Sequence, residues 1–296
     1  MPEGGPPSTA GGATVGDYLL DNRQMEAGVR LDAISGLFDA ATFRMLASTG
    51  ITGGWRCWEV GAGGPAVASW LSARVGPSGQ VLATDIDTTW LDAAAWPGGA
   101  VPDGVAVVRH DVTADPLPDG PFDLIHARLV LVHLPGRADV AAALTGLLAP
   151  GGWLVIEDAD PQLQPLACID EYGPDQVLAN KVRAGFRSLL AGRGVDLAFG
   201  RTVPRLLRSL GLVDVVAESH FPVTSPISSL LERATVEQTR AGLVGAGLVT
   251  DHEVERHLAN LAEARLDVTT APMVSARGRR PVDGGAPQES SPGGDR

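Results

Sequence analysis

A glycine-rich segment carries residues that could hold a nucleoside cofactor. The segment WRCWEVGAGGPAVASWL, residues 55–71, contains Gly61, Gly63 and, where a third small residue would fall, Ala66. This G-x-G-x-x-G/A spacing permits a tight turn and a close approach of the backbone to a ligand. Dinucleotide sites and other nucleoside sites share the pattern, so by itself it leaves the adenosine cofactor open.

Polar residues stand at the ends of successive expected strands. Glu59 closes the first strand, Asp85 the second, and His110 with Asp111 the third. Asp85 lies at a suitable distance for a carboxylate that accepts both ribose hydroxyls, and a carboxylate there disfavours a 2′-phosphate. His110 and Asp111 offer acceptors for an exocyclic amine such as adenine N6. Because ligands of doubly wound sheets bind beyond the carboxyl ends of the strands, these residues predict an adenosine site there.

The elements that must position these residues alternate between short apolar runs and helical patterns. This alternation predicts a doubly wound, mainly parallel α/β sheet. The expected strands are residues 56–61, 80–85, 105–111, 122–127 and 152–158, with two further candidates at 213–223 and 272–280. Apolar stripes predict helices over 140–148 and 203–210, and Pro150–Gly152 is expected to end the first of these before the next strand.

Other segments interrupt or flank the sheet pattern. Residues 161–200 and 225–265 look helical and are expected to form cap insertions above the strand ends, and the amphipathic stretch 17–48 is expected to add N-terminal lid helices on the same side. The Gly/Pro/Ser-rich ends at 1–16 and 281–296 predict disordered tails. The expected folded domain therefore covers 17–280.

Composition narrows the partners. A formal charge of −12 and a pI near 4.9 oppose a broad phosphate-binding surface, so nucleic acid is not expected. Cys57 and Cys168 lie far apart without metal-ligand spacing, which predicts reduced thiols and no metal site. No apolar run approaches the roughly 20 residues of a membrane span, and the first residues lack the features of a signal peptide. We expect a cytoplasmic protein without a membrane partner.

The stretch from about Trp55 to Asp160 resembles the core of the class I S-adenosylmethionine-dependent methyltransferases of the small-molecule type. The matching motifs, in the family's order, are EVGAGG, VLATDID, VRHDV, FDLIHARLVLVHLP and LLAPGGWLVIED. The resemblance implies a Rossmann-like seven-stranded sheet with an antiparallel terminal hairpin, and S-adenosylmethionine as cofactor. Pro65 departs from the family, which often has a third glycine there, but proline fits the first turn of a helix.

An NAD-dependent dehydrogenase is the alternative interpretation of the glycine loop. It would leave Asp111 and the segments HAR and PGGW unexplained. It would also need an acid for hydride transfer, and neither Tyr18 nor Tyr172 is followed by Lys at the Tyr-x-x-x-Lys spacing.

The resemblance, taken position by position, implies a set of cofactor contacts. The glycine loop would line the methionine moiety, the second strand end the ribose, and the third strand end the adenine edge. The residues expected to contact the cofactor are Tyr18 in the lid, Glu59, Gly61, Ala62 and Gly63 in the glycine loop, Asp85 and Ile86 after the second strand, His110, Asp111 and Val112 after the third, and Ala127 and Arg128 after the fourth.

Methyl transfer requires in-line alignment of a nucleophile, and a base only where the acceptor must lose a proton. The candidates for that base are His133, one turn past the fourth strand, and Glu157 and Asp158 after the fifth. Each could instead be a packed or hydrogen-bonded structural residue. His126 alternates with the apolar side chains of its strand, which favours a structural role.

We therefore expect an enzyme that methylates O, N or C of a small, apolar or aromatic secondary metabolite. The alternative is a protein of this fold that binds the cofactor without methylating, either a cyclase-like catalyst or a binding module. The helical insertions suit an acceptor pocket. They could equally bury a subunit interface, so a homodimer stays open.

Overall fold

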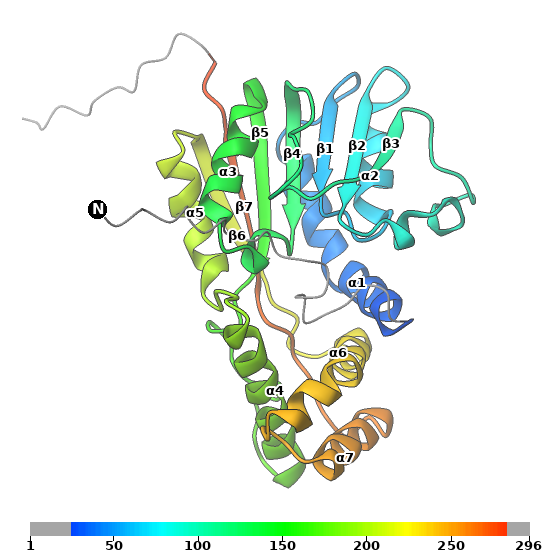
Figure 1. The fold of residues 1–296 in the computed structure, drawn as a ribbon, viewed down its shortest axis with the longest axis vertical. Coiled ribbons are helices and arrows are strands. Elements are labelled where there is room, and N and C mark those ends of the chain that lie inside the picture. Colours follow the sequence, from blue (N-terminus) through cyan, green and yellow to red (C-terminus); the bar gives the residue numbers. More distant parts are fainter. Residues whose placement is uncertain (1–24, 283–296) are drawn as a thin grey trace, which may run out of the picture.

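The computed structural model describes residues 25–282, which form a sheet flanked by helices and a helical group beyond one end of the sheet (Figure 1). The strands are β1 (Arg56–Val60), β2 (Gln80–Asp85), β3 (Val105–Arg109), β4 (Phe122–Arg128), β5 (Leu148–Ala159), β6 (Val213–His220) and β7 (Met273–Arg279). The helices are α1 (Met25–Ala47), α2 (Ala66–Val75), α3 (Arg137–Gly146), α4 (Pro174–Gly192), α5 (Phe199–Ser209), α6 (Pro226–Gly245) and α7 (Asp251–Ala262). Short 3₁₀ turns are η2 (Thr89–Leu91), η3 (Ala93–Ala95) and η4 (Leu131–His133).

The strand order in the seven-stranded sheet is β3-β2-β1-β4-β5-β7-β6. Strands β1 to β5 pair in parallel, whereas β7 runs antiparallel to both β5 and β6. The order reverses between β1 and β4, which is the switch point where such sheets bind ligands. The predicted doubly wound sheet with an antiparallel terminal hairpin is confirmed.

Alternation along the strands separates two apolar layers. Trp58 faces a cluster that includes residues of α3 and α5, whereas its neighbour Cys57 faces a cluster with α2 and the end of α1. Both faces of the central strands are thus covered, which is why the strands read as short, nearly continuous apolar runs. Because side chains alternate along a strand, Glu59 of β1 points to the same face of the sheet as Cys57, the face that packs against α1 and α2.

The prediction that Pro150–Gly152 ends a helix before the next strand is wrong. Helix α3 ends at Gly146, and the Pro-Gly-Gly segment lies inside β5. Phe122 of β4 pairs with Leu148, but Leu124 pairs with Trp153, so the register shifts between these pairs. β5 therefore has more residues between these two pairs than β4 does, which is a β-bulge or similar irregularity. The strand begins at Leu148, before the apolar run that the sequence analysis assigned to it.

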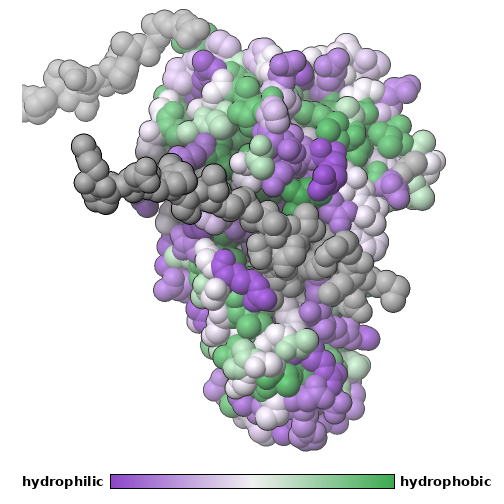
Figure 2. Space-filling model, viewed as in Figure 1, coloured by the Kyte–Doolittle hydropathy of each residue, from purple (hydrophilic) through white to green (hydrophobic). Residues whose placement is uncertain are grey.

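The helical group beyond the strand ends consists of α4, α6 and α7, which we call the cap. Its helices share an apolar cluster that includes Leu178, Val182, Val236, Leu243 and Val254. Helix α1 joins the cap to the sheet, because Ile34 and Phe38 pack with Ile227 and Leu231 of α6. Figure 2 shows hydrophobic residues interspersed with hydrophilic ones over the cap and the sheet layer, as expected when the main apolar helix faces pack inward.

Some expectations fall outside the described residues. These are the tails expected at 1–16 and 281–296, except residues 281 and 282, and the beginning of the expected lid, including Tyr18. Within residues 25–282, no helix is both long and apolar enough to cross a membrane.

Candidate active site

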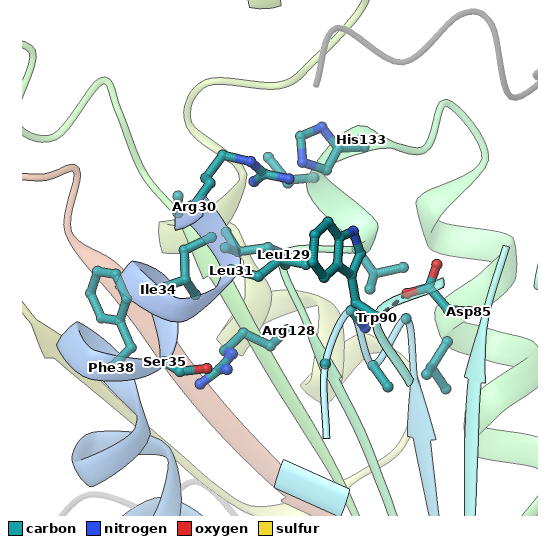
Figure 3. A pocket seen from close by; sticks show the side chains of 18 of the residues that line it. Arg30, Leu31, Ile34, Ser35, Phe38, Asp85, Trp90, Arg128, Leu129 and His133 are labelled. Carbon is teal, nitrogen blue, oxygen red and sulfur yellow. Dashed lines mark hydrogen bonds between the residues drawn. The ribbon is translucent and has the colours of Figure 1, made fainter. Parts of the chain in front are cut away.

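A cavity of about 1070 Å³ lies between the carboxyl ends of the parallel strands and the cap. Its lining comes from the β1–α2 loop, the ends of β2, β3 and β4, and the inner faces of α1, α4 and α6. Figure 3 shows part of it, with Arg30, Leu31 and Ile34 of α1 on one side and Asp85 on the other. The expected cofactor residues that line it are Glu59, Gly61, Ala62, Gly63, Asp85, Ile86, His110, Asp111, Val112 and Arg128.

The glycine loop approaches its neighbours too closely for larger residues. Gly61 has φ of 64°, in the left-handed region, and a Cβ there would lie 2.3 Å from Val130 Cγ2. Gly63 lies below α1, where a Cβ would come within 3.0 Å of Leu31 Cδ2. The loop therefore turns tightly under α1 and leaves its backbone facing the cavity.

Asp85 ties the loop to the end of β2. Its Oδ2 accepts a hydrogen bond from Gly63 N at 2.9 Å, and its Oδ1 accepts one from Asp87 N at 3.0 Å. Burial raises the pKa of Asp85, and the two backbone hydrogen bonds partly offset this effect. Each carboxylate oxygen has a second lone pair, so the side chain can still accept two hydroxyl groups of a ligand.

His110 and Asp111 form the third strand end. His110 Nε2 lies 3.1 Å from Pro116 O, and because a carbonyl only accepts, Nε2 carries the proton. The buried Nδ1 is then an acceptor, and it has no hydrogen-bond partner among the described residues. Asp111 Oδ1 accepts from Thr113 N at 2.8 Å and from Thr113 Oγ1 at 2.6 Å, which fixes the carboxylate. The two residues can receive an exocyclic amine.

Helix α1 supplies an apolar wall that the strand-end motifs did not indicate. Leu31, Ile34, Ser35 and Phe38 line the cavity at positions i, i+3, i+4 and i+7 of the helix (Figure 3). Trp90 lines the cavity beside them and packs on Gly28, where a Cβ would lie 2.5 Å from the indole ring. The helical periodicity of residues 17–48 was the signal in the sequence that could have identified these lining residues, because an amphipathic helix directs one face inward.

The end of β4 places its residues differently. Ala127 is fully buried and does not line the cavity, whereas Arg128 lines it and is held by Asp39 Oδ1 at 2.8 Å and Thr42 Oγ1 at 3.1 Å. Leu129, which follows, has φ of 56° and also lines the cavity. A left-handed leucine is strained, and such strain concentrates at ligand sites.

His133 lines the cavity at the end of η4. Burial lowers its pKa to about 4, and the nearby charges of Arg30 and Arg137 act in the same direction. The imidazole is therefore neutral near pH 7 and can accept a hydrogen bond or a proton there.

Glu157 belongs to a buried polar ladder, which we define as Glu59, His126, Glu157, Thr42 and Ser275. His126 Nδ1 lies 2.7 Å from Glu59 Oε2, and Nε2 lies 3.0 Å from Glu157 Oε2. Thr42 Oγ1 donates to Glu157 Oε2 at 2.6 Å, and Ser275 Oγ donates to Oε1. The ladder crosses β1, β4, β5 and β7 and reaches α1; of its members, only Glu59 lines the cavity.

The ladder changes the ionisation of its members. Burial by itself lowers the pKa of His126, but the charges of Glu59 and Glu157 and the hydrogen bonds to both carboxylates together outweigh burial and raise that pKa to about 9. Burial raises the pKa of Glu157, but the hydrogen bonds from His126 and Ser275 and the charges of His126 and Arg128 together outweigh burial, so the net shift is downward. His126 is thus an imidazolium that donates from both ring nitrogens, one to Glu59 and one to Glu157. These contacts support the structural role expected for this residue.

Asp158 points to the opposite face of β5, is fully buried and does not line the cavity. Burial raises its pKa well above the ordinary value, and the backbone of Val132 and the charge of Arg137 offset this only in part. Of the three candidate bases, the structure brings His133 to the cavity and leaves Glu157 and Asp158 outside it.

The lining fits S-adenosylmethionine on structural grounds. A backbone cradle that a Cβ at Gly61 would fill lies beside Asp85, and the orphaned Nδ1 of His110 lies at the neighbouring strand end. Glycine loop, carboxylate and imidazole would thus receive the amino-acid moiety, the ribose and the adenine amine in the order of the strands.

Comparisons with known proteins agree with this geometry. The family model "Methyltransferase domain" matches residues 58–156. A nocamycin O-methyltransferase from Saccharothrix syringae is 30% identical over 253 residues, which cover 77% of this chain and 86% of that protein. A methyltransferase from Strobilurus tenacellus is 35% identical over 192 residues, which cover 64% of this chain and 65% of that protein.

Among solved structures, a phosphoethanolamine N-methyltransferase 2 from Haemonchus contortus in complex with S-adenosyl-L-methionine aligns with a TM-score of 0.55. The alignment covers 92% of this chain and 61% of that one at 15% identity, so it supports the fold alone. The chain also spans only 50% and 65% of the lengths of two Strobilurus tenacellus relatives that it matches.

Proposed function

The chain belongs to the class I S-adenosylmethionine-dependent methyltransferases, and from this premise we propose that it methylates a small molecule held between the strand ends and the cap. S-adenosylmethionine, when bound, supplies a methyl group on a sulfonium that is already a strong electrophile. The chain's own task is to bind, orient and exclude water, for which orientation alone can contribute about 7–11 kcal/mol in favourable cases.

We assign cofactor binding to the strand-end residues. Asp85 would accept the ribose hydroxyls, and the Gly61–Gly63 backbone would lie against the methionine moiety. His110 Nδ1 and Asp111 would receive the adenine amine. The observation that carries the assignment is the hydrogen bond that Gly63 N donates to Asp85 Oδ2, because it joins the expected ribose acceptor to the glycine loop.

We assign acceptor binding to the opposite part of the cavity. Its apolar lining comes from three helices and one strand that are far apart in sequence, namely Ile34 and Phe38 of α1, Phe186 and Leu190 of α4, Leu231 of α6, and Met273 of β7. Such a lining suits a small molecule with an apolar or aromatic body. The nocamycin O-methyltransferase favours a secondary metabolite as the acceptor, and its name favours oxygen over nitrogen or carbon as the methylated atom.

His133 is the proposed orienting group for the acceptor. As a neutral imidazole on the cavity wall, it can accept a hydrogen bond from an acceptor O–H or N–H and hold the nucleophile in line. Glu157 and Asp158 lie outside the cavity, so we assign them no contact with the reacting atoms.

The test is a two-step measurement on the full chain. Calorimetry should show S-adenosylhomocysteine binding at micromolar affinity or better, with no response to NAD. Labelled S-adenosylmethionine should then transfer methyl to at least one member of a set of phenols, carboxylic acids and amines. Tight NAD binding without a response to S-adenosylhomocysteine would overturn the cofactor assignment, and cofactor binding without transfer to any acceptor would leave a binding protein of this fold.

A further inference from the structure

The cap side of the cavity contains a polar wall within an otherwise apolar lining. Arg183 and Arg187 lie four residues apart on α4, and Ser228 and Glu232 lie four residues apart on α6. All four line the cavity, as does Thr270 from the segment before β7. Residues spaced by four share a helix face, so the two helices present these groups to the same space. We call these five residues the cap wall.

Three polar atoms of the cap wall that can donate a hydrogen bond are buried and have no hydrogen-bond partner among residues 25–282. They are Arg187 Nε, Ser228 Oγ and Thr270 Oγ1. Ser228 is 0% exposed and Thr270 6%, so their hydroxyl groups are shielded from bulk water. Buried polar groups in native proteins are almost always paired, and several orphans on one cavity wall indicate that a ligand pairs with them.

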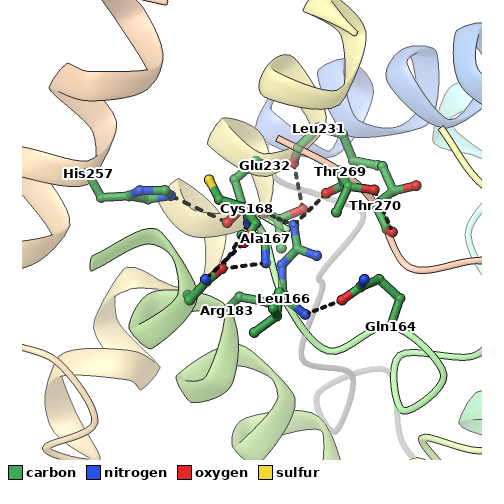
Figure 4. Close-up of polar contacts among 12 residues, drawn as sticks. Gln164, Leu166, Ala167, Cys168, Arg183, Leu231, Glu232, His257, Thr269 and Thr270 are labelled. Atoms are coloured by element: carbon green, nitrogen blue, oxygen red, sulfur yellow. Dashed lines mark hydrogen bonds and ion pairs between the residues drawn. The ribbon is translucent and has the colours of Figure 1, made fainter. Parts of the chain in front are cut away.

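The charge of the cap wall is set by a buried ion pair. Arg183 Nη2 donates to Glu232 Oε2 at 2.5 Å and to Thr269 O at 3.1 Å (Figure 4). His257 Nε2 lies 3.3 Å from Glu232 Oε1 on the side of α7. Burial raises the pKa of Glu232, but the charges and hydrogen bonds of Arg183 and His257 together outweigh burial and lower that pKa to about 2. Glu232 is thus ionised, and Arg183 balances its charge.

Arg187 then leaves the wall with a net positive charge. It makes no ion pair with any residue of the described part of the chain, whereas Arg183 and Arg128, which also line the cavity, each have a carboxylate partner. The hydroxyls of Ser228 and Thr270 add donors beside it. A guanidinium with neighbouring hydroxyl donors is suited to an anionic oxygen group.

We propose that the cap wall is a subsite for a carboxylate-class oxyanion on an acceptor whose remaining body is apolar. Arg187 pairs with the oxyanion, Ser228 and Thr270 donate hydrogen bonds to it, and the Arg183–Glu232 pair holds α4 and α6 at the required separation. The inference rests on the proposed function, because it describes the molecule that this methyltransferase accepts.

The test compares a carboxylate with its neutral isostere. The probes are 4-phenylbutyrate and 4-phenylbutanamide, titrated by calorimetry into the full chain with and without S-adenosylhomocysteine. The carboxylate should bind at least about tenfold more tightly than the amide, as expected for a hydrogen-bonded charge pair. Arg187→Gln should reduce this preference to about threefold or less, and Arg187→Lys should retain part of it because the charge remains.

Two further variants separate the subsite from general effects. Arg233→Gln removes the same charge from α6 at an exposed ion pair outside the cavity, so it should keep the full preference. Ser228→Ala removes one donor with little change in volume and should weaken carboxylate binding several-fold while leaving the amide unchanged.

The outcomes distinguish this inference from the proposed function. Equal binding of the two probes, no binding of either, or a preference that survives in Arg187→Gln overturns the subsite, even where S-adenosylhomocysteine binds normally. Failure of S-adenosylhomocysteine to bind overturns the proposed function, and the carboxylate preference of the ligand-free protein is still measured.

Discussion

His126 Nδ1 lies 2.7 Å from Glu59 Oε2, which joins a fully buried imidazole on β4 to a carboxylate that lines the cavity. The other ring nitrogen contacts Glu157, which in turn accepts from Thr42 of α1. The ladder therefore connects the glycine-loop strand to the helix that forms the apolar wall. Its integrity depends on the proton that His126 carries.

Stability should fall in alkaline solution through His126. The folded-state pKa is raised from 6.5 to about 9, so its contribution is fully present below pH 6.5 and is lost as pH rises through 9. A shift of this size corresponds to roughly 3 kcal/mol. The melting temperature of the parent protein should therefore fall more steeply between pH 6.5 and 9 than the melting temperature of His126→Gln. Parallel curves for the two proteins would contradict the charged state of His126.

Gly61→Ala should disrupt the cofactor loop. The new Cβ would lie 2.3 Å from Val130 Cγ2 on a residue with φ of 64°, and strain plus overpacking should destabilise the fold by about 1–3 kcal/mol. Gly64→Ala is the matched control, because nothing lies within 4 Å of a Cβ there. Denaturant unfolding of both variants checks the expectation, which fails if the two lose equal stability.

Asp85→Ala should weaken cofactor binding more than Asp111→Ala. Loss of two charge-assisted hydrogen bonds to ribose, each about 1.5–3 kcal/mol, should lower S-adenosylhomocysteine affinity by at least about tenfold. Asp85→Ala also removes the acceptor for Gly63 N. Asp111 already accepts from Thr113 N, so we expect Asp111→Ala to remove fewer hydrogen bonds to the cofactor. Calorimetric titration of both variants with S-adenosylhomocysteine measures the two affinities. An unchanged affinity in Asp85→Ala would show that another residue accepts the ribose hydroxyls.

His133→Gln should lower turnover and leave the cofactor in place. Removal of a group that positions or deprotonates the acceptor typically lowers the rate by about 10²-fold. Because the pKa of His133 is lowered to about 4, the parent's rate should lose the contribution of His133 only as pH falls through that value. Steady-state kinetics with a transferred label test this, together with S-adenosylhomocysteine titration as the control. A kcat within twofold of the parent's would show that His133 is structural.

The strand-end part of the site followed from the sequence alone. Asp85, His110 and Asp111 each end or follow a short apolar run, and parallel strands bring their carboxyl ends to one edge of the sheet regardless of the details of packing. The mainly parallel α/β sheet was predictable from the alternation of apolar runs and helical patterns, and the antiparallel terminal hairpin from the resemblance to the methyltransferase family, because both signals are local in the sequence. The Pro150–Gly152 error is also local: proline and glycine interrupt helices and form strand irregularities alike.

The tertiary structure alone decided which side chains meet. Strand register placed His126 between Glu59 and Glu157 and turned Asp158 to the other face, so two candidate bases left the cavity while His133 stayed in it. The cap wall likewise needed the packing of α4 against α6, as the Arg183–Glu232 pair shows with a separation of 49 residues in the sequence. Contacts of this kind depend on how helices cross and strands align. No periodicity within one segment encodes them, because the local pattern of a helix or strand says which face is buried and not which residue of another element it meets.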